Sequence, residues 1–211
     1  LSEAVRVDKG DRWRLQRTLG EEEANEFIQS LHQSAITALS SMPEYNATVK
    51  LVEVAVLSDD PEIRRRAAEA LIPRDRTDYM PLLMDGLESL LELSVRIDTT
   101  PGGAVQIVEE LYEAGQKVDR SSVRTTDYLT SRITREEDGR IVIDNRTAED
   151  VARADAHARR SEEWVEQQNE ARRQFNERVE EALYTITGLS LGSDAESWWK
   201  NWGDYNDMES S

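Results

Sequence analysis

The stretch SDDPEIRRRAAEALIP, residues 58–73, decides the fold of the first half of the chain. An aspartate can cap the free amides at a helix start, and Pro61 fits the first helical position. Apolar residues then recur at helical spacing up to Pro73. They are Ile63, Ala67, Ala70 and Leu71. The stretch therefore predicts a helix with one apolar face.

Helical patterns continue on both sides of this stretch. Residues 21–43 carry apolar side chains at steps of three and four, and Pro43 closes the pattern. Residues 49–57 are rich in valine and are compatible with a strand, but the helix start that follows them favours a helix. A third helix is predicted near residues 79–87, with Pro81 in its first turn. Residues 1–20 have no clean period and predict a lead-in.

Residues 51–87, LVEVAVLSDDPEIRRRAAEALIPRDRTDYMPLLMDGL, resemble a HEAT-type helical repeat. In that family an acidic turn and a proline precede a second helix rich in arginine and alanine. The resemblance implies a stack of helix pairs. Because such repeats bury their faces only against neighbours, we expect another element to cap the stack.

The middle of the chain predicts a small antiparallel sheet. Residues 93–97 alternate apolar and polar, residues 99–103 form a turn, and residues 105–112 are compatible with either a strand or a helix. The Asp138-Gly139 pair, between β-forming residues 123–135 and RIVID, is typical of a tight hairpin. A two-residue turn there would place Glu137 opposite Arg140.

A long helix is predicted after the sheet. Thr147 and Asp150 resemble a capping box, and Gly188 suits the left-handed stop about 41 residues later. At 1.5 Å per residue such a helix is roughly 60 Å long. The predicted apolar stripe consists of Trp164, Gln168, Ala171, Phe175, Val179, Ala182 and Ile186.

The last segment carries a cluster of tryptophans. Ser193 and Glu196 resemble a second capping box, for a short helix that carries Trp198, Trp199 and Trp202 and ends at Gly203. Large aromatic side chains suit a chain that is poor in aliphatic residues, so we interpret the cluster as a core anchor. The alternative is a carbohydrate-binding or hydrolytic module, in which Asp194, Asp204 and Asn206 would flank an aromatic platform.

The segment QQNEARRQFNERVEEALYTITGLSLGSDAESWWKNWGDYND, residues 167–207, is similar to a recurrent segment of large planctomycete-type bacterial proteins. The matching positions are Thr187, Gly188, Leu191, Gly192, Asp194, Trp198, Trp199, Trp202, Asp204, Tyr205 and Asn206. In those proteins HEAT-like repeats lie upstream and a Hint-type domain often follows. The resemblance implies an exported or cell-surface protein of which this chain is a piece, and it implies no catalytic residue.

Other candidate motifs do not predict chemistry. Gly188 to Gly192 fits G-x-S-x-G, but a nucleophile elbow needs a strand before the serine, and here a helix precedes it. His32 and His157 lack a partner at metal-ligand spacing, and the chain has no cysteine. The sequence therefore predicts no catalytic, metal or cofactor-binding residue.

One basic cluster, Arg64, Arg65 and Arg66, is either a solvated helix face or a site for an acidic partner. The chain as a whole has 26 basic and 43 acidic residues, for a net charge of −17. This charge repels phosphate backbones and argues against nucleic acid. No apolar stretch is long enough to cross a bilayer, so no membrane insertion is expected.

These observations predict a mainly helical α+β fold. Its parts are a HEAT-like region over residues 1–92, an antiparallel β region over 93–146, and a long helix with a tryptophan-anchored cap over 147–211, all packed as one unit. The function expected is a non-enzymatic structural or protein-interaction module that terminates a repeat region. Its partners would be another protein or adjacent domains of the same polypeptide. The sequence gives no prediction of the oligomeric state.

Overall fold

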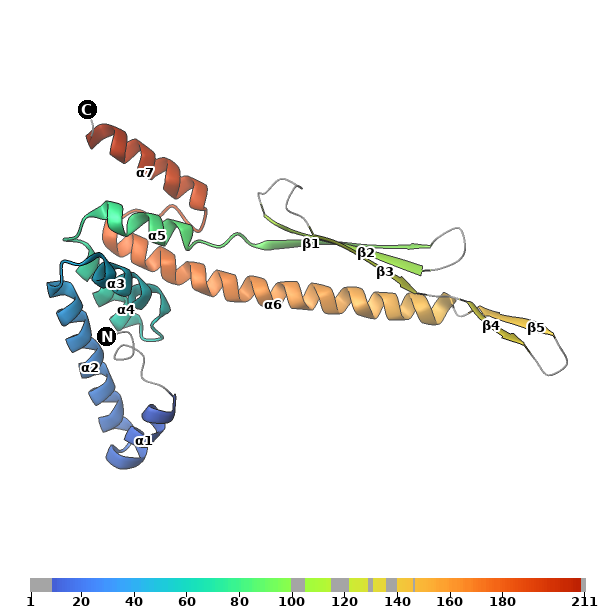
Figure 1. Ribbon diagram of the computed structural model, residues 1–211, viewed down its shortest axis with the longest axis horizontal. Helices are drawn as coiled ribbons and strands as arrows, with labels where there is room; N and C mark the ends of the chain where they lie inside the picture. The colour runs from blue at the N-terminus through green and yellow to red at the C-terminus, as the bar shows by residue number, and fades with distance from the viewer. Residues whose placement is uncertain are drawn as a thin grey trace. The chain divides into compact units, whose positions relative to one another are not determined.

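The chain is a mainly helical α+β protein, as predicted (Figure 1). This computed structural model describes residues 9–99, 105–114, 122–128, 131–135, 140–145 and 147–209. The chain forms two compact units. The first unit is Leu1–Glu88 with Gln174–Ser211, and the second is Ser89–Arg173. One long helix contributes residues to both units.

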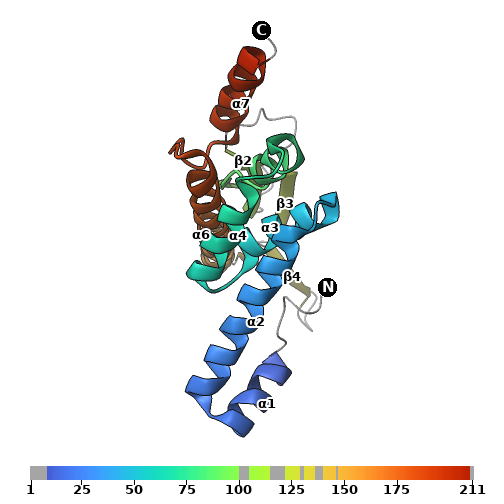
Figure 2. The ribbon, with the colours of Figure 1, turned by 90° about the vertical axis from the view of Figure 1, so that its left-hand side faces the viewer.

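The first unit is built from helices (Figure 2). They are α1 (Lys9–Leu19), α2 (Glu21–Ser41), α3 (Tyr45–Leu57), α4 (Pro61–Leu71), the 3-10 turn η1 (Arg76–Asp78), α5 (Met80–Asp85), the last part of α6 (Thr147–Thr187) and α7 (Ala195–Glu209). The helical reading of the valine-rich stretch is confirmed by α3. The segment before residue 20, for which the sequence predicted only a lead-in without a clean period, contains α1, and this helix packs against α2.

The predicted helix start before α4 is confirmed. Asp60 Oδ1 accepts hydrogen bonds from the amides of Glu62 at 2.9 Å and Ile63 at 3.4 Å. The apolar face of α4 then packs against α3 in the core of the unit. The fully buried aliphatic and methionine side chains of this core are Leu51, Ile63, Leu71, Leu83, Met84, Val179 and Leu183.

The second unit contains the predicted antiparallel strands. The order β1-β2-β3 joins β1 (Leu91–Thr99), β2 (Val105–Glu113) and β3 (Ser122–Tyr128), and a separate pair joins β4 (Ser131–Arg135) and β5 (Ile141–Asn145). Residues 105–112, which the sequence left compatible with either a strand or a helix, belong to the strand β2. One face of the β1-β2-β3 sheet packs on α6, where Val105 and Ile107 of β2 contact Ala154. Alanine on the helix allows the strand a close approach.

The predicted hairpin differs from the structure in two ways. Residues 123–135 do not form one strand: β3 pairs with β2, and β4 pairs with β5. Arg135 lies opposite Ile141, whereas a two-residue turn at Asp138-Gly139 would place it opposite Val142. The prediction is therefore wrong by one position. The turn residues, including Glu137, and the predicted turn at residues 100–103 lie outside the described residues.

The long helix α6 has the predicted limits, but the first half of its apolar stripe is wrong. It ends at Thr187, and Gly188 adopts a φ of +73°. Trp164, Gln168 and Ala171 are exposed, and the buried stripe lies one residue later. The buried positions are Asp150, Ala154, Ala158, Val165, Asn169, Asn176, Val179, Ala182, Leu183 and Ile186.

Two buried asparagines of α6, seven residues apart, each bind the main chain of a single residue through two hydrogen bonds. In the first unit, Asn176 accepts from the Glu88 amide at 2.9 Å and donates to the Glu88 carbonyl at 2.8 Å. In the second unit, Asn169 does the same for Leu91, at 2.7 and 2.8 Å. A buried amide or carbonyl without a partner is costly, so these side chains satisfy the backbone where no helix or sheet does.

We predict that Asn176→Ala lowers the free energy of unfolding by about 1–3 kcal/mol, because the amide and carbonyl of Glu88 lose their partners. Urea denaturation followed by circular dichroism measures this change. Gln168→Ala is the matched control, since Gln168 is exposed on the same helix and should change stability by less than about 0.5 kcal/mol. Equal stability of the two variants would contradict the role given to Asn176.

Candidate functional site

The tryptophan cluster on α7 lies mostly inside the first unit. The exposed fraction of Trp198 is 2 % and that of Trp202 is 9 %, and both belong to the same core as α3, α4 and α5. The indole Nε1 of Trp198 donates to the carbonyl of Gly192 at 2.7 Å. This bond satisfies the one polar atom of the buried indole and fixes the turn that leads into α7.

A second group of aromatic side chains joins α7 to η1. The rings of Trp202 and Tyr205 stack with centroids 5.6 Å apart, and the guanidinium of Arg76 lies 5.2 Å from the Tyr205 ring. Tyr79, next to η1, is fully buried. Its burial raises the pKa of the Tyr79 phenol, and the nearby Arg76 opposes that shift. These rings are used in packing between elements of the unit.

The acidic side chain expected to flank the cluster, Asp194, caps α7. Its carboxylate accepts from the Glu196 amide at 3.2 Å, the Ser197 amide at 3.1 Å and the Ser197 hydroxyl at 2.5 Å. The Ser197 hydroxyl is the main cause of the lowered pKa of Asp194. The predicted cap at Ser193 is therefore wrong, and so is the predicted end at Gly203, since α7 continues to Glu209.

We predict that Asp194→Ala lowers the free energy of unfolding by about 1 kcal/mol, the usual cost of losing a helix cap. Ser193→Ala should leave stability within about 0.5 kcal/mol of the parent, because Ser193 is exposed and Asp194 supplies the cap. Thermal and urea unfolding of the two variants measure the difference. A larger loss of stability in Ser193→Ala than in Asp194→Ala would show that Ser193 is the cap.

Trp199 is the one member of the cluster that stays exposed, at 39 %. Asp204 is also exposed, whereas the side chain of Asn206 lies outside the described residues. A sugar platform usually needs an accessible ring face beside free polar groups, and Asp194 is already engaged with the α7 amides. The accessible part of the cluster is thus a single ring.

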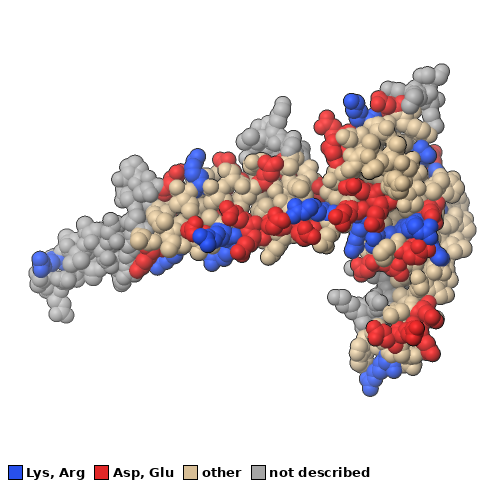
Figure 3. Space-filling model, turned by 180° about the vertical axis from the view of Figure 1, so that it is seen from behind, with Lys and Arg blue, Asp and Glu red and all other residues tan. Residues whose placement is uncertain are grey.

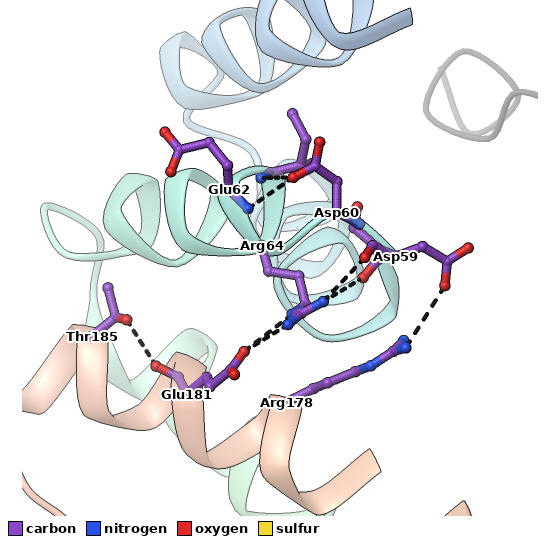
Figure 4. Close-up of polar contacts among 9 residues, drawn as sticks. Asp59, Asp60, Glu62, Arg64, Arg178, Glu181 and Thr185 are labelled. Carbon is purple, nitrogen blue, oxygen red and sulfur yellow. Dashed lines mark hydrogen bonds and ion pairs between the residues drawn. The ribbon is translucent and has the colours of Figure 1, made fainter. Parts of the chain in front are cut away.

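The three arginines of α4 have different environments. Arg64 is buried and donates through Nη2 and Nε to Glu181 of α6, at 2.8 and 3.2 Å (Figure 4). Its Nη1 donates to the Ser58 carbonyl at 3.1 Å. Nearby, Arg178 of α6 pairs with Asp59 at 3.7 Å (Figure 4). These contacts join the turn before α4 to α6, so Arg64 serves the packing of the unit.

The other two arginines pair with carboxylates on their own helix. Arg65 binds Glu62 at 2.7 Å and also contacts Glu69, and Arg66 binds Glu62 at 2.8 Å. Hydrogen bonds from Arg65 and Arg66 lower the pKa of Glu62 from the ordinary 4.5 to about 2. The exposed side of α4 therefore carries opposite charges in contact, which weakens its attraction for an acidic partner.

We predict that the Glu62 carboxylate makes the chain sensitive to acid. Because its folded pKa is depressed, its stabilising contribution is complete above about pH 4.5 and is lost as the pH falls towards about 2. Thermal midpoints measured between these values should fall less steeply for Glu62→Gln than for the parent. Glu177→Gln, at an exposed position on α6, should keep the parent slope. If the thermal midpoint of Glu62→Gln fell with pH as steeply as that of the parent, the Glu62 carboxylate would not be coupled to folding.

The remaining candidates form no catalytic constellation among the described residues. His157 Nε2 lies 3.5 Å from Glu109 Oε2, where the buried Glu109 of β2 faces α6. In those parts of the chain no three histidine or acidic side chains gather as a metal site requires. The Gly188–Gly192 turn follows a helix, and Ser190 is exposed on it.

Sequence reasoning missed the buried polar residues Asn169, Asn176 and Glu109. The two asparagines could have been found from their spacing of seven residues on a helix whose stripe is otherwise apolar. Glu109 stands at an inward position of an alternating strand, directly opposite Arg124 on β3. Its burial depends on which face of the sheet meets α6, and this face was not decided by the local sequence.

Comparison with family models, curated proteins and solved structures finds no match to this chain. Among the helices that the structure describes, none is long and apolar enough to cross a membrane.

Proposed function

We propose that the chain is a non-enzymatic structural and protein-interaction module that terminates a helical-repeat region. The observation that carries this proposal is the burial of Trp198 and Trp202 against α3, α4 and α5. With these side chains α7 closes the core of the first unit. The HEAT-like resemblance of residues 51–87 supplies the expectation of a repeat region of a larger bacterial protein.

The packing of the α3–α4 helix pair supports this proposal. The pair has apolar side chains on several sides, as α3 alone buries Leu51, Val52, Val54, Ala55 and Val56. A pair of short helices buries such surfaces only against further elements. Here α2, α5, α6 and α7 supply them, so the arrangement resembles a stack with a closing element.

The net charge of the chain limits which kinds of partner we expect it to bind. A net charge of −17 favours partners with basic or neutral surfaces and disfavours nucleic acid and anionic lipid. The paired arginines of α4 leave little excess positive charge on that helix for an acidic segment. We therefore favour a protein partner or a neighbouring domain over the sugar-binding or hydrolytic alternative, which needs the Trp198 and Trp202 rings exposed.

We predict that Trp198→Ala lowers the free energy of unfolding by about 3–5 kcal/mol, because it removes a fully buried indole and leaves a cavity. Trp199→Ala, at the partly exposed tryptophan of the same helix, should lower it by clearly less, because Trp199 is 39 % exposed. Urea denaturation followed by circular dichroism compares the two variants without relying on tryptophan emission.

A fluorescence titration separates this proposal from the sugar-binding alternative. The parent chain should show no change in tryptophan emission with soluble cello-, chito- or xylo-oligosaccharides at millimolar concentration. Saturable quenching that is lost in Trp199→Ala would overturn the proposal, as would a Trp198→Ala variant as stable as the parent.

A further inference from the structure

The strand β1 forms one edge of the three-stranded sheet in the second unit (Figure 1). All nine of its residues, Leu91–Thr99, pair with β2 on one side. On the other side, no strand among the described residues pairs with it. An edge strand of this length offers main-chain donors and acceptors to a further strand, so the accessibility of this edge matters for binding.

Hydrogen bonds at the start of β1 show which of its main-chain groups point away from β2. The amide and the carbonyl of Leu91 both bind Asn169 of α6, at 2.7 and 2.8 Å. The Ala114 amide, which follows β2, donates to the Leu90 carbonyl at 2.7 Å. Leu91 therefore turns its groups outward and Leu90 turns its carbonyl towards β2. Because this direction alternates along an antiparallel strand, every second residue after Leu91 also points its groups outward. These residues are Leu93, Val95, Ile97 and Thr99.

Asn169 occupies the edge at the first residue of β1, and the edge is open beyond it. Over residues 93–99 the described contacts give the outward amides and carbonyls no partner from another element. No side chain of residues 91–98 is buried, although Ile107 and Glu109 on the adjacent strand are. The edge is therefore accessible from Leu93 onwards.

The side chains along this edge are apolar on the face that packs on α6. Val95 lies opposite Glu109 and Ile97 lies opposite Ile107, and residues directly opposite one another share a face of the sheet. Ile97 is nevertheless 39 % exposed, and Leu93 and Val95 are half-buried. A further strand with an apolar residue at every second position would cover these side chains.

The two edges of the sheet differ in how they oppose strand addition. On β3, Arg124 lies opposite Glu109 and places a charge on the face that packs on α6. An inward-pointing charge on an edge strand is a common defence against a further strand. The inward positions of β1 hold Leu93, Val95 and Ile97 instead. Strand addition is therefore favoured at β1 over β3.

The opposite face of the sheet carries an excess of negative charge beside the β1 edge. Glu92 lies on this face, and Glu110 lies there opposite Ser94. The arginine of this strand, Arg96, is already paired with Asp98 at 2.8 Å. Acidic side chains also predominate among the charged residues on the face drawn in Figure 3, in keeping with the net charge of −17. Basic side chains would therefore suit this face of an added strand.

We propose that β1 binds an extended segment of a protein partner, in which apolar and basic residues alternate. The main chain of this segment would pair with residues 93–99, its apolar side chains would lie beside Val95 and Ile97, and its basic side chains would lie near Glu92 and Glu110. The proposal rests on the proposed function, because it names the partner class of a protein-interaction module. A second copy of the chain fits less well, since it carries the same net charge of −17.

A synthetic peptide of alternating lysine and valine, as long as β1, tests the proposal with the full chain. Fluorescence anisotropy of the labelled peptide at about 150 mM salt should show saturable binding. A peptide of the same composition, with its lysines and valines in separate blocks, should bind at least about tenfold more weakly. Equal binding of the two peptides would reduce the interaction to charge alone and would overturn the proposal.

Two N-methylated forms of the alternating peptide test main-chain pairing without any variant of the chain. One form is methylated at the valine amides and the other at the lysine amides, so charge and composition stay the same. Because only alternate amides of an added strand face β1, one form should lose binding and the other should keep it. Loss of binding in both forms, or in neither, would contradict strand addition.

Ile97→Pro tests the edge itself. Its amide points away from β2, so proline leaves the β1–β2 hydrogen bonds in place while it blocks a further strand. This variant should bind the alternating peptide at least about tenfold more weakly and keep the parent circular dichroism spectrum. Thr125→Pro is the matched control, because by the same alternation the Thr125 amide points outward at the β3 edge. Equal weakening by the two variants would overturn the assignment to β1.

Sedimentation without peptide separates a protein partner from a second copy. The parent chain should stay at 24.1 kDa. A parent that doubles this mass, and that Ile97→Pro returns to 24.1 kDa, would assign the edge to a second copy and overturn the proposal. None of these results bears on α7, since β1 belongs to the second unit and Trp198 to the core of the first. Failure here is thus distinguishable from failure of the proposed function, which the stability of Trp198→Ala decides.

Discussion

Backbone groups at the ends of helices and in the links between them need hydrogen-bond partners, and side chains from neighbouring elements supply many of them here. Arg74 donates to the carbonyls of Leu39 and Met42 at 2.6 and 2.7 Å, where α2 ends. Arg64 and Trp198 bind carbonyls in the turns before α4 and α7. In each case a side-chain donor binds a main-chain carbonyl at the end of a helix or in a turn.

This use of polar side chains follows from the composition. Hydrophobic residues make up 38 % of the chain, so few are available to cover the links between helices. Buried Arg64 and Asn176 occupy positions where an aliphatic side chain would leave a carbonyl or an amide without a partner. Part of the packing specificity therefore comes from fixed hydrogen-bond geometry, which the loss of one partner disrupts more than a small change of volume does.

The positions of the charged side chains follow from the same hydrogen-bonding contacts. Arginines are used against main-chain carbonyls and against carboxylates, as with Arg64 and Glu181, or Arg65 and Glu62. Most of the basic side chains whose contacts are described therefore have acidic neighbours, and the excess of carboxylates remains on the surface. Helix α1 differs from the rest of the chain in the sign of its charge. Its basic residues outnumber its single aspartate, and the helix adjoins the acidic start of α2.

Features with a local cause could be predicted from the sequence. Asp60 and Pro61 start α4, and Gly188 ends α6, because caps and stops depend on a few adjacent residues. Features that depend on distant partners could not. The shift of the α6 stripe by one residue reflects the sheet that packs on it. The pairing of Arg135 with Ile141 reflects the geometry of two strands together.

The candidate site also combines features with a local cause and features that depend on distant partners. Clustering of Trp198, Trp199 and Trp202 was visible in the sequence, and the helical period already placed Trp198 and Trp202 on one face. Which face is buried was decided by packing against η1 and α5, together with the bond from Trp198 to Gly192.

The side chains of α7 and the buried side chains of the α1–α2 pair lie in separately packed parts of the first unit. The side chains of α7 complete the main core, so their loss affects α3, α4 and α5 together. Ala24 and Ile28 are buried outside that core, where α1 covers only the first half of α2. Substitutions at Phe27 therefore remove little from the free energy of the core, whereas Trp198 contributes to it directly.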